Sequence, residues 1–579
     1  MARVATLAAA SLLAAPLARV PLAAGAQRER SSAERAARDA QRKFESYRRL
    51  QLPRVAAREG GCDVTIGRFC YWDDNSDAPL PAERPGVGRA RATLRALLDS
   101  LSALDSSSDY IAGQRVRYAL ESGEALSAAT LLDGCAATPW WCLALRGLAW
   151  HHAGDEPRSA AAFDSALATM PDTLRCAWLD LRKWLPSGMH LSSSKHPDCA
   201  ERERLSARVF WLSAPLLSWR PEATRDEFLA RRTILAILSG TATPHRISWG
   251  SDLVEVALRF GWPDRWARED AAVGALSTPE ISVVGHEPTP SFIFVPERHA
   301  LESPLEASPD DWRLAGNRKP PMRYAPGWLT IIDTLPIQIA RFLRAGGDSM
   351  VIVAAFDARA SLLGGDSATA DPAVGDSTVR AAALLAVAAE STLAAGQSSG
   401  AFSGAITLQA ASRPALAAVE VVDSARARAA RWRGAVAPLD RSVLVSDLLV
   451  GIAGAAVPPI LLDSAVPHAI APLRVSAGDT IALYWESYAR ATPDHPARVA
   501  LRLVPLSRGF MSRIGRALGL ARAEPPVSLA WNDPGRAAAE VGRSLRVAIP
   551  AVPRGSYRIE LVVEAGGVRG TTSRRIVVR

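Results

Sequence analysis

The chain has 579 residues, of which 48% are hydrophobic and 22% are charged, as is ordinary for folded globular domains. This length predicts about three or four domains. The formal net charge is +9. Because the arginines are interleaved with acidic residues along most of the chain, we expect no continuous basic surface and no nucleic-acid partner.

The first 26 residues are typical of a secretory signal peptide. Arg3 precedes an apolar run rich in Ala and Leu, and the small residues Ala24, Gly25 and Ala26 form a cleavage site. We therefore expect a mature chain that starts at Gln27 and is exported to the periplasm or the extracellular space.

Six cysteines follow, all in the first third of the chain, and an exported protein keeps such residues as disulfides. Six cysteines allow 15 connectivities, and we favour sequential pairing because each pair then closes a short loop. A metal site is disfavoured because no pair has the C-x-x-C spacing, and we expect no cofactor. The predicted pairs are Cys62–Cys70, Cys135–Cys142 and Cys176–Cys199.

Residues 27–88 predict one helix and a disulfide loop. Ser31 and Glu34 form a capping box at the start of a helix that runs to about Leu50. The acidic run that holds Asp73, Asn75 and Asp77 resembles a calcium loop in its alternation, but the Gly and Glu that an EF-hand requires are replaced. A solvated acidic loop is the better interpretation.

Residues 89–205 predict a helical domain with a repeat. One unit holds small and aromatic residues at regular spacing: Gly147, Trp150, Gly154, Phe163, Ala166 and Pro171. This spacing resembles the tetratricopeptide repeat, in which helical hairpins stack, and a weaker copy precedes it. We expect at least three hairpins between Arg89 and Leu185.

Arrays of this kind usually present a concave face to a protein or peptide. The candidate partner-binding residues are Tyr110, Tyr118 and Trp141. A helical platform for the rest of the chain is an equally good interpretation.

Two short motifs in this part resemble metal-binding or catalytic motifs, but we assign neither function to them. The adjacent residues His151 and His152 point about 100° apart on a helix, so they do not readily share one metal ion. Ser192 and Lys195 have the S-x-x-K spacing of penicillin-binding proteins, but they lie in a loop without the companion motifs.

Residues 206–279 carry two motifs separated by an apolar run. The first contains Trp249, Ser251 and Asp252, and the second contains Phe260, Gly261, Pro263 and Asp264. With the Glu-x-x-x-Arg pattern inside 227–232, they resemble the GWxTD domain family of extracytoplasmic bacterial proteins. The resemblance implies architecture and location, and it implies no activity.

The apolar run between these motifs is ambiguous, because residues 253–260 fit both a strand and a helix. Trp249, Trp262 and Trp266 predict a buried aromatic cluster. Asp252 and Asp264 are a candidate carboxylate pair, although helix-capping and turn roles explain both. The turn 262–264 is a further candidate functional segment.

From residue 280 the hydrophobic period changes to two, which predicts strands. We expect a linker with the first strands over 280–345, a β-rich domain over 346–465 and an immunoglobulin-like sandwich over 466–579. Gly396 to Gly400 fit G-x-S-x-G, but no helix follows, so a hairpin loop is favoured. Residues 507–522 form a basic amphipathic segment that either contacts a membrane or caps the sandwich.

The fold class predicted from these features is α+β multidomain, with helical hairpins first and β-sandwiches after them. We favour a secreted or periplasmic protein that is non-enzymatic and binds a partner or serves as a scaffold. One alternative is an extracytoplasmic hydrolase with a site in the β region. The other is a peripheral envelope protein docked through 507–522.

Overall fold

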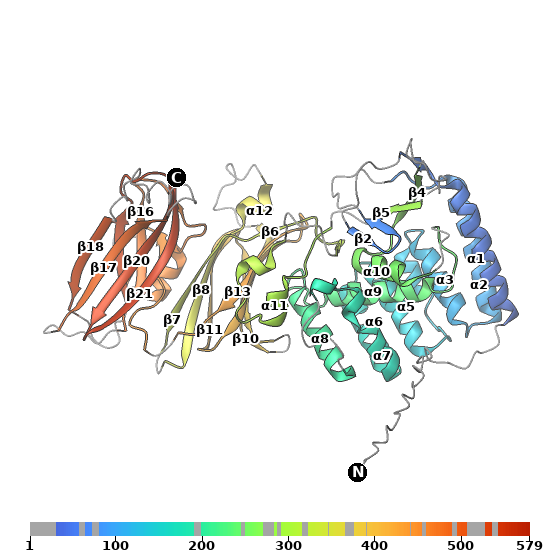
Figure 1. Ribbon diagram of the computed structural model, residues 1–579, viewed down its shortest axis with the longest axis horizontal. Coiled ribbons are helices and arrows are strands. Elements are labelled where there is room, and N and C mark those ends of the chain that lie inside the picture. The colour runs from blue at the N-terminus through green and yellow to red at the C-terminus, as the bar shows by residue number, and fades with distance from the viewer. Residues whose placement is uncertain are drawn as a thin grey trace, which may run out of the picture.

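Three parts follow one another along the longest axis of the molecule in the computed structural model (Figure 1). A helical part comes first, a middle β-sandwich follows, and a second β-sandwich ends the chain, which confirms the predicted α+β organisation. The structure describes residues 31–56, 64–71, 80–189, 198–244, 249–269, 283–286, 291–314, 322–344, 347–364, 376–388, 391–439, 442–453, 459–488, 495–506, 527–534 and 542–579.

The helical part begins with the predicted capped helix. The Ser31 hydroxyl accepts the Glu34 amide at 3.0 Å, and Ala33, Ala37 and Phe44 are buried along one face. The helices are α1 (Ser32–Gln51), α2 (Pro85–Leu104), α3 (Asp109–Leu120), α4 (Ala125–Thr130), α5 (Pro139–His152), α6 (Glu156–Thr169), α7 (Asp172–Trp178), α8 (Cys199–Leu212), α9 (Ala223–Leu238) and α10 (Ser251–Phe260), with 3-10 turns η1 (Leu181–Lys183) and η2 (Ser187–Met189).

Helices α5 and α6 form a tight antiparallel pair. A Cβ atom added to Gly147 would lie 2.7 Å from the ring of Phe163, so only glycine allows this approach. Gly154 turns the chain between the two helices at a φ of +74°. Helices α3 and α4 form a pair upstream of this one. Helix α7 packs on α8, but α8 begins at Cys199, beyond residue 185, where we expected the repeats to end.

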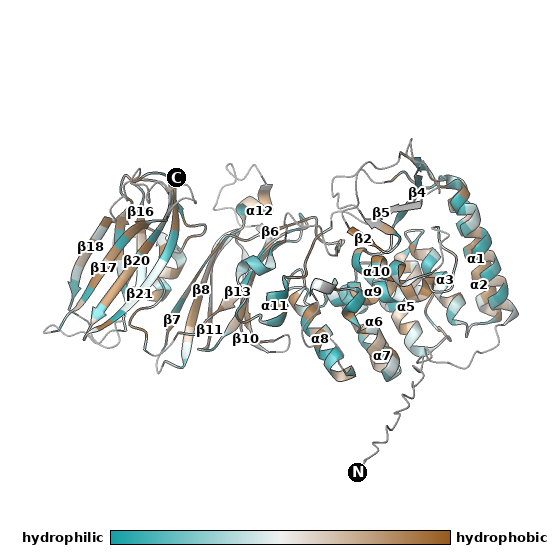
Figure 2. Ribbon diagram, in the orientation of Figure 1, coloured by the Kyte–Doolittle hydropathy of each residue, from teal (hydrophilic) through white to brown (hydrophobic). Residues whose placement is uncertain are grey.

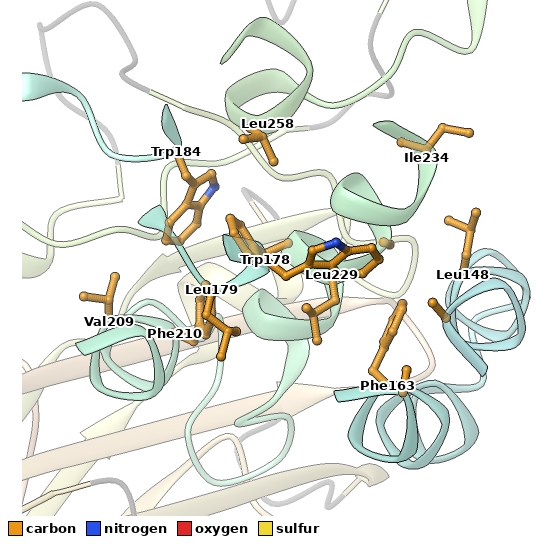
Figure 3. Packing of buried hydrophobic residues seen from close by; sticks show 14 of the residues in the cluster. Leu148, Phe163, Trp178, Leu179, Trp184, Val209, Phe210, Leu229, Ile234 and Leu258 are labelled. Atoms are coloured by element: carbon orange, nitrogen blue, oxygen red, sulfur yellow. The ribbon is translucent and has the colours of Figure 1, made fainter. Parts of the chain in front are cut away.

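The largest hydrophobic core lies between these helices and α9. Figure 3 shows side chains from α5, α6, α8, α9 and α10 converging on one cluster. The same cluster continues into the middle sandwich through Leu384, Ala386, Leu416 and Ala418. The labelled members are Leu148, Phe163, Trp178, Leu179, Trp184, Val209, Phe210, Leu229, Ile234 and Leu258.

Short strands lie against the helical part. β1 (Arg54–Val55) pairs in parallel with β4 (Arg265–Glu269), which pairs with β5 (Val283–His286). The hairpin β2 (Val64–Ile66) and β3 (Phe69–Tyr71) contacts the start of α10. The ambiguous run 253–260 is helical, because Leu253, Ala257 and Phe260 then share one buried face.

The predicted linker packs on the helices where the structure describes it. Phe292 and Tyr324 form a β-bridge, and the Arg323 amide donates to the Arg259 carbonyl at 2.8 Å. Helix α11 (Arg298–Glu302) and the 3-10 turn η4 (Pro309–Trp312) lie between them in sequence.

The middle part is a sandwich of two sheets whose facing side chains form one core. One sheet has the order β10-β9-β12-β13-β6 and the other β11-β8-β7, and β10 runs through Gly400 without a helix after it. The elements are β6 (Ile331–Thr334), β7 (Ile337–Leu343), β8 (Ser349–Asp357), α12 (Arg359–Leu363), β9 (Asp376–Ala386), β10 (Thr392–Gly400), β11 (Ser403–Ala411), β12 (Ala415–Asp423) and β13 (Arg428–Val436).

The last part is a second sandwich, with sheet orders β14-β16-β19 and β15-β21-β20-β17-β18. Figure 2 shows hydrophilic and hydrophobic residues alternating along its strands. The elements are β14 (Leu449–Ile452), α13 (Leu462–Ala465), η6 (Val466–His468), β15 (Arg474–Val475), β16 (Thr480–Glu486), β17 (Ala497–Pro505), β18 (Val527–Asp533), β19 (Gly542–Ala548), β20 (Gly555–Ala565) and β21 (Val568–Val578).

Two predicted boundaries differ from the structure. β6 and β7 belong to the middle sandwich, because β6 pairs with β13 and β7 pairs with β8, so this sandwich begins at Ile331 and not at 346. β14 pairs with β16, which moves the boundary between the sandwiches from 465/466 to residues 437–448. Strand pairing between distant segments decides both positions.

A buried cluster of charges joins the helical part to the middle sandwich. We call Glu420, Arg431 and Arg433 the junction cluster. Glu420 accepts the amides of Leu217 and Ser218 at 2.7 and 2.8 Å. Arg431 and Arg433 donate to main-chain carbonyls over residues 212–215, and all three side chains are at most 3% exposed. The loop after α8 is thereby fixed to β12 and β13.

In the part of the chain that the structure describes, no helix is both long and apolar enough to cross a membrane.

Candidate functional site

A cavity of about 730 Å³ lies beside the second family-like motif. Its walls come from the C-terminal ends of α3 and α5, from α9, from the turn 261–264 and from residues 323–328. This volume is within the usual range for ligand sites. We therefore take the cavity as the candidate functional site.

The turn after α10 brings its motif residues to the cavity wall. Gly261 has a φ of +92°, which favours glycine, and it ends the helix. Phe260 is buried, and Trp262 packs on Trp266 with ring centroids 5.1 Å apart. Gly261, Pro263 and Asp264 line the cavity with them.

The Glu-x-x-x-Arg pattern reaches the same wall. Glu227 and Arg231 lie one turn apart on α9 and form an ion pair. The Arg231 guanidinium also donates to the carbonyls of Leu258 at 2.8 Å and Arg323 at 2.6 Å. One side chain thus ties α9 to α10 and to residue 323, so two motifs that are distant in sequence meet at one cavity.

His151 extends this arrangement from the end of α5. Its Nε2 lies 2.7 Å from the second oxygen of Glu227. We call His151, Glu227 and Arg231 the cavity cluster. Burial alone would lower the pKa of His151, but the hydrogen bond and charge of Glu227 raise this pKa above its usual value. Burial opposes ionisation of Glu227, yet Arg231 and His151 hold its pKa well below the usual range.

Asp226 lies next to this cluster and is buried, with 1% of its surface exposed. Desolvation raises its pKa to about 7, although Arg225 and His151 act in the opposite direction. Its Oδ2 is buried without a hydrogen-bond partner among the described residues. Asp226 is therefore a carboxyl group that exchanges its proton near neutral pH.

Aromatic groups from residues 324–328 form another part of the wall. The ring of Trp328 stacks under the Arg220 guanidinium, 4.4 Å away, and Arg220 forms an ion pair with Glu156. The Tyr324 hydroxyl makes no hydrogen bond to the described residues, and burial raises its pKa well above the usual value. The Nε1 of Trp328 is likewise buried without an acceptor in the described chain.

The far end of the cavity meets a buried polar network. Arg117 bridges Glu45 at 2.7 Å and Glu121 at 2.8 Å, and Arg48 donates to Glu121 at 2.9 Å. Burial would raise the pKa of Glu121, but Arg48 and Arg117 lower it to about 2. These charges pair mainly with one another across α1 and α3, although the Oε2 atom of Glu45 has no hydrogen-bond partner among the described residues.

The predicted partner-binding residues lie elsewhere. Tyr118 is fully buried, and its hydroxyl donates to Glu45 at 2.8 Å. Trp141 is 5% exposed and donates to the Asp109 carbonyl. Tyr110 is half-buried under the Arg38 guanidinium. Tyr118 and Trp141 are core side chains, because the hairpins pack on α1 and α9 on the face where we expected a partner.

The residues of the first family-like motif form a separate contact. Asp252 binds the Arg68 guanidinium at 2.6 Å, which holds its pKa well below the usual range, and it therefore does not pair with Asp264. Ser251 is exposed in the first turn of α10. Trp249 packs at the edge of the main core, whereas Trp262 and Trp266 form the pair already described.

The structure confirms one predicted disulfide and contradicts another. Cys135 and Cys142 are bonded, as predicted. Cys176 and Cys199 are free thiols, which corrects the predicted pair. Their helices pack together, and the hydrogen bond of the Cys199 thiol with Cys176 is the main cause that raises the pKa of Cys199 to about 11. The pair Cys62–Cys70 cannot be placed, because Cys62 and the Cys70 side chain lie outside the described residues.

Several other predictions also fall outside the described residues. They concern the signal peptide 1–26, the acidic loop with Asp73, Asn75 and Asp77, the residues Ser192 and Lys195, and the segment 507–522. Within the described part, no group of three or more His, Cys, Asp or Glu is arranged to hold a metal ion.

Sequence reasoning missed most of this cavity. It singled out the turn and the Glu227–Arg232 pattern but did not join them, and it considered His151 as a metal ligand only to reject that role. A His at the end of a helix carries no signal for a Glu 76 residues away. Tyr324 and Trp328 lie in a stretch that we interpreted as a linker.

Comparisons with known proteins add little. No protein-family model and no curated protein matches the chain. Solved structures with similarity include Escherichia coli alpha-2-macroglobulin activated by porcine elastase (11% identity, 42% of this chain, 23% of that chain, TM-score 0.14) and red sea bream transglutaminase (10%, 58%, 43%, 0.14). The native conformation of E. coli alpha-2-macroglobulin is similar at 13% identity, over 43% of this chain and 16% of that chain, with a TM-score of 0.13. The chain spans less than half of each of these proteins, and TM-scores this low support no inference about function.

Proposed function

We propose that the protein is an exported, non-enzymatic binding protein that takes part of a protein or peptide partner into the cavity at 261–264. Residues 1–26 have the pattern of a secretory signal, and the Cys135–Cys142 disulfide is compatible with an oxidising compartment. The similarity to the GWxTD family stays a prediction that agrees with this location.

One observation carries the proposal. The cavity is large enough for a ligand, and Glu227 and Arg231 in its wall are paired with each other and tied to the main chain. Such a wall is rigid and pre-formed, as a binding site requires.

The alternative of a hydrolase lacks a hydroxyl nucleophile with a base in reach at this site. Ser291 and Tyr324 carry the hydroxyl groups among the described lining residues, and the Ser291 hydroxyl accepts from Arg323. His151 uses Nε2 for Glu227 and contacts neither hydroxyl in a described hydrogen bond. An activated nucleophile with its base is therefore not assembled among these residues.

The test is capture from an envelope extract with the mature full-length chain as bait. Ala153→Trp and Ala325→Trp place large side chains at half-buried positions that line the cavity. Ala161→Trp makes the same change on the exposed face of α6, away from the cavity, and is the matched control. Circular dichroism and thermal melting verify that all three variants fold.

We expect the wild-type chain and Ala161→Trp to capture the same protein, and both cavity variants to lose it. Equal capture by all four proteins, or no capture by any of them, would contradict the proposal.

A further inference from the structure

The floor of the cavity is aliphatic. Leu120, Leu148, Ala230 and Ile234 come from α3, α5 and α9 and line it side by side. Burial of one leucine-sized side chain on such a surface contributes about 1.5 to 3 kcal/mol. The floor therefore favours a ligand with an apolar side chain, and it offers little to a polyol, whose hydroxyl groups would lose their water there.

Several of the charges that line the cavity are already matched. Arg231 binds Glu227, Arg48 binds Glu121, and Glu156 binds Arg220. A ligand with a formal charge would have to displace one of these partners, which costs free energy in a partly desolvated site. The rim therefore favours an uncharged ligand segment.

Polar groups with unused hydrogen-bonding capacity remain on the wall. The buried Nε1 of Trp328 has no acceptor and the Nδ1 of His151 has no partner within the described chain. The Tyr324 hydroxyl also makes no hydrogen bond to the described residues, and all three side chains line the cavity. Trp Nε1 is only a donor, so its partner must be an acceptor such as a carbonyl oxygen.

We propose that the cavity holds an uncharged, extended peptide segment with one apolar anchor side chain on the floor formed by Leu120, Leu148, Ala230 and Ile234. Backbone carbonyls of the segment accept hydrogen bonds from the Tyr324 hydroxyl and, once its ring turns toward the cavity, from Trp328 Nε1. This inference rests on the proposed function and adds the chemistry of the ligand. A peptide combines an apolar side chain with adjacent carbonyls, which is the combination that the floor and wall offer.

The test uses isothermal titration calorimetry with the mature full-length chain. The probes are capped pentapeptides, Ac-Gly-Gly-X-Gly-Gly-NH2, in which X is Leu, Phe, Ser, Lys or Glu, and the neutral sugars maltotriose and chitotriose. We expect the Leu or Phe peptide to bind at least about tenfold more tightly than the Ser, Lys and Glu peptides.

Three substitutions assign the contacts. Tyr324→Phe removes the hydroxyl and keeps the ring, and Trp328→Phe replaces the indole with a smaller ring that has no donor, so each should weaken the best peptide about 2- to 10-fold. Trp485→Phe is the matched control, because the Nε1 of Trp485 is also buried without an acceptor in the described chain but lies in the core of the second sandwich, outside the cavity lining. It should leave affinity unchanged.

Binding of a sugar in place of the peptides, equal affinity for all five peptides, or no binding of any peptide would overturn this inference. The captured partner separates the two proposals. If Ala153→Trp and Ala325→Trp abolish capture while the peptides fail to bind, the cavity is the binding site and the peptide assignment is wrong. If those variants capture normally, the proposed function itself fails.

Discussion

The junction cluster and the cavity cluster are built from the same chemistry. In each, an arginine paired with a glutamate donates to main-chain carbonyls of other elements: Arg433 to those of residues 212 and 214, and Arg231 to those of residues 258 and 323. The clusters differ in what surrounds them. The Arg433 and Glu420 side chains are 0% exposed, whereas those of His151 and Glu227 are 15% and 18% exposed beside an open cavity.

This difference separates an architectural role from a binding role. The enclosed junction cluster fixes the orientation of two domains, and no ligand reaches it, although the Nε atoms of Arg431 and Arg433 have no partner among the described residues. The cavity cluster also holds its elements in place, but its histidine retains an unpartnered Nδ1 and lies beside a carboxyl group with a pKa of about 7. The open cavity next to the cavity cluster allows a ligand to bind beside these charged groups.

The largest effect is expected at the junction. Glu420→Ala leaves Arg431 and Arg433 buried without their carboxylate, so the free energy of unfolding should fall by about 3 to 5 kcal/mol. Urea unfolding followed by far-UV circular dichroism measures the change. A loss below about 1 kcal/mol would show that the carbonyls alone satisfy the two arginines.

A smaller loss is expected at the cavity. Arg231→Met removes the ion pair with Glu227 and two carbonyl contacts but keeps the length of the side chain, and we expect a loss of about 2 to 4 kcal/mol. Because Arg231 supports the turn at Gly261, the tryptophan fluorescence of the folded variant should also change. Unchanged fluorescence would show that the turn holds its position without Arg231.

The third prediction concerns pH. The pKa of Asp226 is about 7 in the folded protein against 3.8 ordinarily, so the folded state binds more protons than the unfolded state between these values. This contribution to stability is complete below about pH 4 and is lost as the pH rises through about 7. The raised pKa of His151 acts in the same direction.

Asp226→Asn removes the titration of this group. At pH 8 the variant should be more stable than the wild type by about 4 kcal/mol, and the two proteins should converge near pH 4. Urea unfolding of both proteins across this range gives the difference directly. A difference that does not change with pH would place the Asp226 pKa at its ordinary value.

The smallest effect is expected at exposed charges, which belong to neither cluster. Glu564 and Arg569 form an ion pair at 3.7 Å with side chains 46% and 57% exposed. Glu564→Gln should change the free energy of unfolding by at most about 0.5 kcal/mol, and it serves as the control for Glu420→Ala. A larger change would mean that charge loss by itself destabilises this protein, with or without burial.

Local patterns predicted many elements. The Ser31 cap and the Cys135–Cys142 disulfide follow from short-range spacing, and the structure has them as expected. These features involve residues close in sequence, so chemistry over a few positions decides them.

Features that depend on distant neighbours were not predicted. The hydrophobic pattern of residues 253–260 fits both the two-residue period of a strand and the 3.6-residue period of a helix. This segment is a helix because it packs on the rest of the helical part. Tyr118 and Trp141 have the residue types of a binding surface but are buried by α1 and α9. The thiols of Cys176 and Cys199 come together without a bond, a distinction that spacing does not contain.

The sequence by itself determined the order of helices and strands, because hydrophobic period and capping residues act locally. It also marked the turn at 260–264 and the Glu227–Arg231 pair as separate motifs. Only the tertiary structure brought them to one cavity with His151, Tyr324 and Trp328, and only strand pairing placed the domain boundaries. The reason is physical: a buried charge or an unpaired strand edge must find a partner, and that partner can lie anywhere in the chain.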